Sequence, residues 1–271
     1  MKIFSLILVF ALNLCGCSNA PEPVRPAPEN LRILSLVTAA DHILSELGAA
    51  DKIAAIDRHG RVLDSMQYTP VTVAGGMVSR EMLKKYRINF AIIWYYQKHL
   101  AEIFRKEGIA CLVIDPIRLE NYPELVIELG NLSGKKVEAE KLNKKISSAF
   151  APLQAAGNKT KSIYIELYAP WKSPAADGYT GQILKAAGGK LSGAAPRGGT
   201  VSPEVVAMAK PEVIFFVENS GSVQEISSRA ALADTPAVKN KRIYPIPRKL
   251  LCEGVAPREL LNFLSDKIKD L

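Results

Sequence analysis

One stretch of sequence occurs twice in this chain, at a constant offset of 123 residues. The copies span residues 76–94 and 199–217, and they align without a gap. Each copy has a serine that suits a helix N-cap, then a short helical segment, then an apolar run typical of a buried strand. The offset is too long for a solenoid repeat. The repetition therefore predicts two similar lobes.

Each copy places one glutamate in the first turn of its predicted helix. Ser79 and Ser202 are the expected N-caps, and Pro203 suits the first helical position, which needs no N–H donor. Glu81 and Glu204 follow, where the helix dipole favours a negative charge. Capping alone explains a carboxylate at a helix terminus. The repeat also implies that each lobe presents one glutamate at the same place.

Short apolar strands alternate with helices along most of the chain, and 48% of the 271 residues are hydrophobic, enough for a sizeable core. This alternation predicts an α/β fold with mostly parallel sheets and helices on both faces. The predicted strands are 32–36, 52–56, 70–73, 90–94, 109–114, 162–167, 213–217 and 242–245. The predicted helices outside the repeat are 38–47, 98–107, 122–132, 180–187, 229–233 and 257–271.

A long helix is predicted between the two copies of the repeat. Residues 135–156 contain no glycine, and their only proline is Pro152, near the end. Apolar side chains recur there at helical spacing. About twenty helical residues span ~30 Å, roughly the width of a small domain. The sequence therefore predicts two doubly wound α/β lobes, 31–132 and 158–271, joined by a connecting helix at 133–157.

The first seventeen residues have the features of a targeting segment. Lys2 precedes an apolar run that is too short for a permanent membrane span, and the run ends in Leu14-Cys15-Gly16-Cys17. This ending resembles a bacterial lipobox, which implies a lipid on Cys17 and an anchor in a bilayer. The alternative is an ordinary secretory signal with an incidental cysteine. Residues 18–30 are rich in proline and predict an extended tether.

Composition and motifs narrow the class of function. The formal charge is +8, but the charges are scattered and only 7% of residues are aromatic, which favours an anionic ligand or a membrane face over nucleic acid. His42, His59 and His99 lack metal-ligand spacing, and neither a phosphate loop nor a G-x-S-x-G motif occurs. We therefore expect no catalytic residue, metal site or cofactor. The sequence does not decide whether Cys111 and Cys252 form a disulfide bond.

In open α/β sheets, ligands bind beyond the carboxyl ends of the strands. The loops at these positions contain aromatic and cationic residues, which suit a bulky, partly apolar, anionic ligand. Two alternatives to a role in ligand binding stay open. The aromatic residues can belong to the hydrophobic core over the strand ends, and the arginines can be solvated surface residues. The candidates for the ligand cleft are Arg58, Trp94, Tyr95, Tyr96, Trp171, Tyr179 and Arg248.

Residues 31–271 resemble the substrate-binding lipoproteins of ABC importers for vitamin B12, haem and iron-siderophores, the class III periplasmic binding proteins. The segments that carry the resemblance are 32–36, 43–48 and 51–53 in the first half, and 181–189, 202–204, 210–214 and 237–244 in the second. The resemblance implies a ligand cleft between two lobes that a long helix joins. It also implies one glutamate on each lobe that docks into arginine pockets of the permease, at Glu81 and Glu204. The chain departs from the family after its first strand, where many members have a proline and a serine and this chain has Val37-Thr38-Ala39-Ala40, so no ligand-specific residue is carried over.

The sequence therefore predicts a lipid-anchored binding protein on the extracytoplasmic, periplasmic face of a membrane. Its expected ligand is a metal chelate, either a ferric siderophore or a cobalamin-like corrinoid, with haem as the alternative. Its expected partner is an ABC permease with its ATPase. Two other classes stay open: a lipid-anchored α/β hydrolase, for which the sequence offers no nucleophile-base pair, and a structural or sensory lipoprotein.

Overall fold

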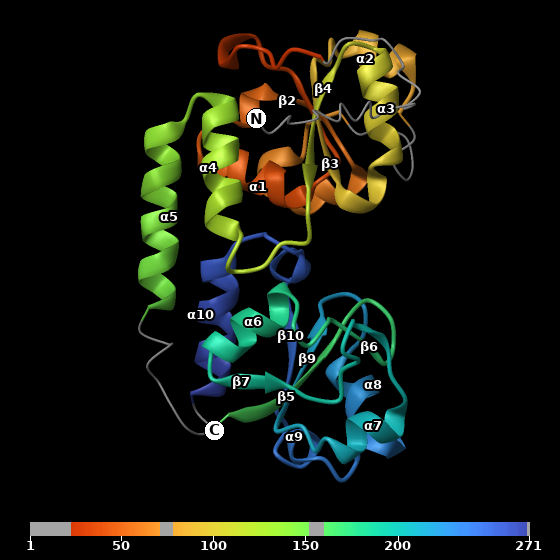
Figure 1. Ribbon diagram of the computed structural model, residues 1–271. Coiled ribbons are helices and arrows are strands. Elements are labelled where there is room, and N and C mark those ends of the chain that lie inside the picture. Colours follow the sequence, from red (N-terminus) through yellow and green to blue (C-terminus); the bar gives the residue numbers. More distant parts are fainter. Residues whose placement is uncertain (1–22, 71–77, 152–159, 270–271) are drawn as a thin grey trace, which may run out of the picture.

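Two four-stranded parallel sheets form the centres of two lobes in the computed structural model, which describes residues 23–70, 78–151 and 160–269 (Figure 1). The N-terminal sheet has the order β2-β1-β3-β4 and the C-terminal sheet the order β10-β9-β5-β7. When the first sheet is followed from its edge strand β2 and the second from its edge strand β7, the strands have the same order along the chain: second, first, third, fourth. This equivalence confirms the two α/β lobes that the repeat predicts. The strands are β1 (Ile33–Ser35), β2 (Ile53–Ile56), β3 (Phe90–Trp94), β4 (Ala110–Ile114), β5 (Lys161–Glu166), β7 (Gly189–Leu191), β9 (Val213–Val217) and β10 (Ile243–Ile246).

Each sheet is doubly wound because successive strand residues point to opposite faces and both faces are apolar. In the N-terminal lobe, Ile33 and Ile92 pack on one face beneath α1 (Thr38–Glu46) and α4 (Tyr122–Ser133). Leu34 and Ile93 pack on the other face beneath α2 (Arg80–Lys85) and α3 (His99–Lys106).

The C-terminal lobe repeats this arrangement. Ile165 and Phe215 pack with α6 (Tyr179–Ala186) and α10 (Pro257–Ile268). Tyr164 and Phe216 pack on the opposite face with α7, α8 and α9. The remaining elements are α7 (Pro203–Met208), α8 (Val223–Ser227), α9 (Pro236–Lys239), the short pair β6 (Lys172–Ser173) and β8 (Gly199–Thr200), and the 3₁₀ turns η1 (Pro28–Asn30), η2 (Ala50–Lys52), η3 (Arg58–Val62), η4 (Asp64–Met66), η5 (Tyr95–Gln97), η6 (Ala230–Leu232) and η7 (Arg248–Leu251). The helix predicted at 229–233 is thus only the 3₁₀ turn η6.

A helical hairpin forms the connection between the lobes (Figure 1). Gly134 has φ +75° and ends α4, because glycine adopts the left-handed conformation without strain. The chain then reverses into α5 (Lys136–Phe150). This helix packs along α4 and also contacts α10 of the C-terminal lobe. The predicted connecting helix extended to residue 157, but residues 152–159 lie outside the described part.

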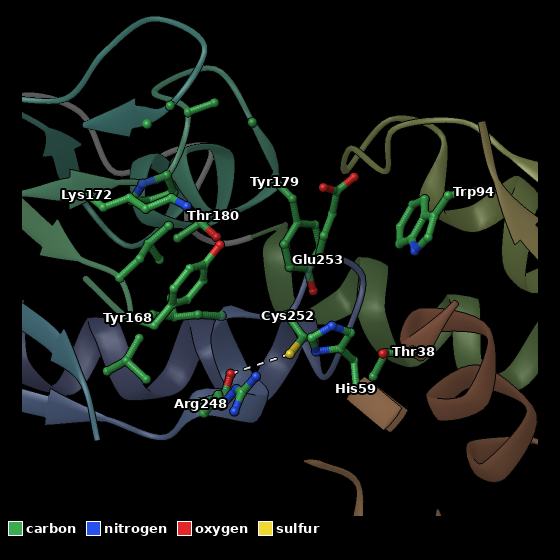
Figure 2. A pocket seen from close by; sticks show the side chains of 18 of the residues that line it. Thr38, His59, Trp94, Tyr168, Lys172, Tyr179, Thr180, Arg248, Cys252 and Glu253 are labelled. Atoms are coloured by element: carbon green, nitrogen blue, oxygen red, sulfur yellow. Dashed lines mark hydrogen bonds between the residues drawn. The ribbon is translucent and has the colours of Figure 1, made fainter. Parts of the chain in front are cut away.

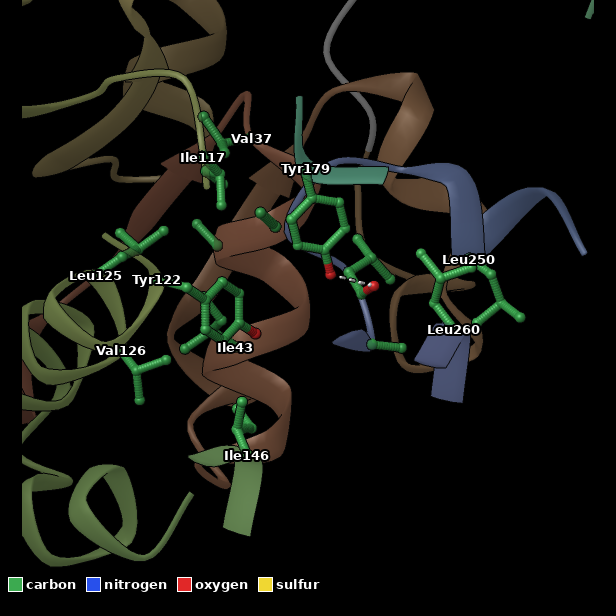
Figure 3. Packing of buried hydrophobic residues seen from close by; sticks show 14 of the residues in the cluster. Val37, Ile43, Ile117, Tyr122, Leu125, Val126, Ile146, Tyr179, Leu250 and Leu260 are labelled. Atoms are coloured by element: carbon green, nitrogen blue, oxygen red, sulfur yellow. Dashed lines mark hydrogen bonds between the residues drawn. The ribbon is translucent and has the colours of Figure 1, made fainter. Parts of the chain in front are cut away.

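One hydrophobic core runs through both lobes. Tyr122 of α4 and Ile146 of α5 belong to the same cluster as Tyr179 of α6 and Leu260 of α10 (Figure 3). Tyr179 is 3% exposed, and its hydroxyl donates a hydrogen bond of 3.0 Å to the carbonyl oxygen of Val255. The lobes are therefore joined by continuous packing as well as by the chain.

Several predictions from the sequence fall outside the described residues. They are the targeting segment with Cys17, the start of the tether, most of the strand predicted at 70–73, and the opening of the first repeat copy at Gly76. Cys111 and Cys252 are both free, so they form no bridge. Among the helices of the described residues, none has the length and apolar character needed to cross a membrane.

Candidate functional site

A cavity of about 930 Å³ lies between the lobes, where the carboxyl ends of both sheets meet (Figure 2). The N-terminal lobe contributes residues that follow β1, β2 and β3. The C-terminal lobe contributes residues that follow β5, β9 and β10, and also β6 and β8. This position agrees with the rule for open α/β sheets. Of the seven cleft residues predicted from the sequence, Trp94, Tyr96, Tyr179 and Arg248 line the cavity, and Arg58, Tyr95 and Trp171 do not.

Aromatic side chains at the end of β3 form one wall. The Trp94 backbone N–H donates a hydrogen bond of 3.0 Å to the side-chain oxygen of Gln97, which holds the turn η5. The rings of Trp94 and Tyr96 stack at 6.3 Å with an interplanar angle of 12°. Tyr95 meets Tyr96 edge-on at 5.3 Å, and it supports the wall from outside the cavity.

The turn η3 after β2 places an imidazole at the cavity. The Asp57 carboxylate accepts a hydrogen bond of 2.8 Å from the backbone N–H of His59 and caps this turn. The His59 side chain lies 3.9 Å from the same carboxylate and lines the cavity, whereas Arg58 is exposed and does not. The prediction named Arg58 in this turn, and the structure places the next residue, His59, on the cavity lining instead.

The segment between β5 and α6 forms the facing wall. Tyr168 and Lys172 line the cavity from this segment, and the Lys172 ammonium lies 4.5 Å from the centre of the Tyr168 ring. Trp171 lies between them but turns away, because its backbone has φ +60°. Its indole instead lies under the guanidinium of Arg229, at 4.8 Å. The sequence prediction for Trp171 therefore differs from its position in the structure.

The turn η7 after β10 completes the cavity. The Arg248 backbone N–H donates a hydrogen bond of 3.2 Å to the Glu218 carboxylate, and the Cys252 thiol lies 3.6 Å from the Arg248 carbonyl oxygen. Burial raises the pKa of the Cys252 thiol and that of the neighbouring Glu253 carboxyl. These side chains come from one short segment that Tyr179 anchors through Val255.

The charges on the lining are unevenly distributed. Lys172, Arg197 and Arg248 all come from the C-terminal lobe, and within the described part of the chain none of them pairs with a carboxylate. The lining carboxylates are Asp57 and Glu253. The cavity can therefore receive an anionic ligand with its negative groups towards the C-terminal lobe.

Sequence reasoning missed Lys172 and Arg197. Lys172 follows the predicted Trp171, and Arg197 precedes the glycines that open the second repeat copy. Gly198 and Gly199 have φ +73° and +107°. A pair of adjacent glycines was thus the one local signal that the chain turns sharply there. In the described ranges, no three histidine, cysteine, aspartate or glutamate side chains are grouped so that they could hold a metal ion.

The two repeated glutamates lie on corresponding helices. The hydroxyl of Ser79 accepts a hydrogen bond of 3.1 Å from Met82 N–H, and Ser202 accepts one of 3.4 Å from Val205 N–H. Glu81 and Glu204 are exposed in the first turns of α2 and α7. Both helices lie on the side of their lobe away from α5 (Figure 1). A backbone hydrogen bond and Ser202 lower the pKa of Glu204, so it is ionised at neutral pH.

The family model described as "Periplasmic binding protein" matches residues 33–250. No curated protein matches the chain. Among solved structures, the periplasmic haem-binding protein RhuT from Roseiflexus in its apo form is similar, with 20% identity over 88% of this chain and 98% of that one, and a TM-score of 0.72. The periplasmic haem-binding protein HutB of Vibrio cholerae has 20% identity over 89% of this chain and 98% of its own, with a TM-score of 0.72. CeuE of Helicobacter pylori with Ni(II) bound has 18% identity over 92% of this chain and 86% of its own, with a TM-score of 0.71. These likenesses confirm the fold.

Proposed function

Because this chain belongs to the periplasmic binding protein family, we propose that it captures a metal chelate and delivers it to an ABC permease. The family consists of solute-binding proteins, not enzymes, and works outside the cytoplasm. The proposed ligand is a ferric siderophore or a cobalamin-like corrinoid, with haem as the second candidate. The mechanism is binding, docking and release, with no chemical step on the ligand.

The observation that supports this proposal best is the contrast between the two walls of the cavity. Trp94 and Tyr96 offer flat apolar faces on one side, and Lys172, Arg197 and Arg248 offer positive charge on the other. Small-molecule pockets typically have ~300–1,000 Å³, and a volume of about 930 Å³ is near the upper end. The site therefore suits a bulky ligand that is partly apolar and carries negative groups.

Haem remains the second candidate because donors for iron lie on the lining. The imidazole of His59 and the phenols of Tyr96 and Tyr168 face the cavity, and both groups serve as axial ligands of haem iron in proteins. Two of the similar structures are named as haem-binding proteins. A siderophore or a corrinoid would use the same aromatic wall without requiring an axial ligand from the protein.

Delivery is proposed to use Glu81 and Glu204 as the contacts with the permease. Each is an exposed carboxylate at a capped helix start, and the two occupy equivalent places on the two lobes. A pair of arginine pockets on the permease would recognise this arrangement, and the associated ATPase would drive release. We further propose that Cys17, which lies outside the described residues, carries the lipid that anchors the protein at the membrane.

The lobes are expected to move little when the ligand enters. The core that passes from α4 and α5 to α6 and α10 would have to break for a wide hinge motion (Figure 3). Packed interfaces resist gradual deformation, so closure is limited to small shifts of side chains and loops. The relative position of the two lobes is thus preorganised, and binding loses little entropy of lobe motion.

The proposal is tested by tryptophan fluorescence of protein without residues 1–17 during additions of hemin, cobalamin and a panel of ferric siderophores. Saturable quenching by one compound is expected, because Trp94 lines the cavity. Trp94→Phe should remove most of the quenching while calorimetry still detects binding. If neither fluorescence nor calorimetry detects any compound in the panel, the proposed ligand class is contradicted.

A further inference from the structure

The C-terminal lobe has a segment with no equivalent in the N-terminal lobe. In the N-terminal lobe, β1 ends at Ser35 and α1 begins at Thr38. In the C-terminal lobe, β5 ends at Glu166 and α6 begins at Tyr179, so residues 167–178 take the place of residues 36–37 and form a much longer connection, the added segment. This added segment contains Tyr168 and Lys172 of the cavity wall. Its conformation therefore determines one side of the site.

Trp171 lies at the centre of this segment, and three different contacts fix it. Its backbone N–H donates a hydrogen bond of 2.8 Å to the Glu166 carboxylate, and its carbonyl oxygen accepts one of 2.9 Å from Val201 N–H. Its indole packs against the buried cluster around Tyr164 and Val206. A φ of +60° is strained for a bulky residue and persists only where the surroundings enforce it.

A nearly buried ion pair supplies that enforcement. The Arg229 guanidinium donates hydrogen bonds of 2.6 and 2.9 Å to the two carboxylate oxygens of Glu166. It also donates one of 2.6 Å to Glu225. The side chains of Arg229 and Glu166 are 12% and 5% exposed. Because the same guanidinium covers the Trp171 indole at 4.8 Å, the ion pair and the tryptophan form one unit.

Strands β6 and β8, which lie on either side of the Trp171–Val201 hydrogen bond, connect the cavity with helix α7. Strands β6 and β8 pair antiparallel, with Lys172 opposite Thr200 and Ser173 opposite Gly199; we call this pair the β6–β8 ribbon. Both strands contribute to the cavity lining, through Lys172, Ser173 and Gly199. From β8 the chain passes through Val201 to Ser202, which caps α7. The helix that presents Glu204 is therefore a direct continuation of a strand that a ligand would contact.

We propose that Trp171 is a positioning residue that couples ligand binding in the cavity to the conformation of the helix start that carries Glu204. A ligand held by Lys172 and Gly199 restrains the β6–β8 ribbon, and the hydrogen bond from Val201 to Trp171 transmits this restraint to the Ser202 cap. The permease can thus distinguish the loaded protein from the empty one at α7. By linkage, docking at Glu204 in turn strengthens ligand binding. This inference rests on the proposed function.

The test is amide hydrogen exchange, followed by mass spectrometry, on the full chain in detergent. In ligand-free protein, Trp171→Gly should raise exchange in peptides covering residues 199–206 about tenfold. Glycine adopts φ +60° freely, so the effect would come from the lost indole contacts and not from backbone strain. Trp171→Phe should restore most of the protection, and Trp94→Phe, which lies off the ribbon, should change nothing there. Unchanged exchange at 199–206 in Trp171→Gly overturns the proposal without reference to any ligand.

The second arm adds hemin, cobalamin or a ferric trihydroxamate siderophore. In the wild-type protein, a bound probe should slow exchange both in the cavity segments 94–97 and 248–253 and at 199–206. In Trp171→Gly, the cavity segments should still respond, and 199–206 should not. If the cavity responds in wild type and 199–206 does not, the coupling is refuted and the binding function stands. If no probe affects the cavity, the proposed function fails, and the coupling fails with it.

Discussion

The backbone N–H of Ile117 donates a hydrogen bond to the carboxylate of Glu253, and this contact crosses from one lobe to the other. Ile117 follows β4 of the N-terminal lobe, and Glu253 lines the cavity from the C-terminal lobe. A second hydrogen bond between the lobes lies nearby. The Leu119 backbone N–H donates it to the side-chain oxygen of Gln182, over 2.8 Å. These bonds fix the relative position of the two cavity walls.

The Glu253 contact predicts a specific loss of stability. Glu253→Ala leaves the part-buried Ile117 N–H without its acceptor, and losing this hydrogen bond should cost about 1 kcal/mol. Glu253→Gln retains a side-chain oxygen and should lose less than half as much. The free energy of unfolding in urea measures both variants. Equal losses for alanine and glutamine would contradict the role of this hydrogen bond.

The cationic wall predicts which substitutions weaken binding. Arg248→Gln and Lys172→Gln should each reduce affinity for an anionic chelate about tenfold, or ~1.4 kcal/mol, and added salt should weaken wild-type binding as well. Arg58→Gln is the matched control, because Arg58 is exposed beside the cavity and does not line it. Calorimetric titration gives the affinities. An equal loss in the Arg58 variant would show that net charge, and not this wall, governs binding.

The docking proposal predicts a separation of uptake from binding. Reversing both charges, Glu81→Lys with Glu204→Lys, should abolish ligand uptake by cells and leave ligand affinity within about twofold, because both side chains lie outside the cavity lining. Glu138→Lys is the control, since Glu138 is also exposed in the first turn of a helix, α5. Uptake that survives the double reversal rules out these glutamates as docking contacts.

From the buried carboxyl group of Asp41 we predict that the free energy of unfolding decreases as the pH rises. It lies on α1, is 1% exposed, and one of its carboxylate oxygens has no hydrogen-bond partner. Burial raises the pKa of Asp41 to about 8, although hydrogen bonding with Ser35 opposes the shift. Between about pH 4 and pH 8 the folded state keeps a proton that the unfolded state has released. Stability therefore falls as pH rises through this range, by at most ~1.4 kcal/mol per pH unit.

Asp41→Asn should flatten this dependence, because the amide is neutral at every pH in the range. The variant should be more stable than wild type above pH 8, and the difference should shrink towards pH 4. Asp64→Asn, at an exposed position, should follow the wild-type curve. Urea unfolding at several pH values measures the three proteins. A wild-type stability that rises from pH 5 to pH 8 with the same slope in Asp41→Asn would contradict a protonated Asp41.

The sequence by itself determined the architecture, because that depends on local and periodic signals. Apolar runs such as 90–94 and 213–217 are buried on both faces and could only be central strands of a parallel sheet. Ser79 and Ser202 marked the helix starts, and the structure shows both as caps. The constant offset predicted two equivalent lobes. The rule for strand ends pointed to the edge of the sheets where the cavity lies, and Trp94 and Arg248, which it named, line that cavity.

Tertiary structure alone decided which neighbouring side chain faces the cavity. The φ of one residue, Trp171, turns its indole away while Lys172 lines the cavity. That φ is imposed by Glu166 and Arg229, which are 63 residues apart. No local pattern encodes such a pairing, because its energy exists only once the chain has folded. The direction of the segment 167–178 is set by this long-range pair, whereas the strands and helices are set by their own sequence.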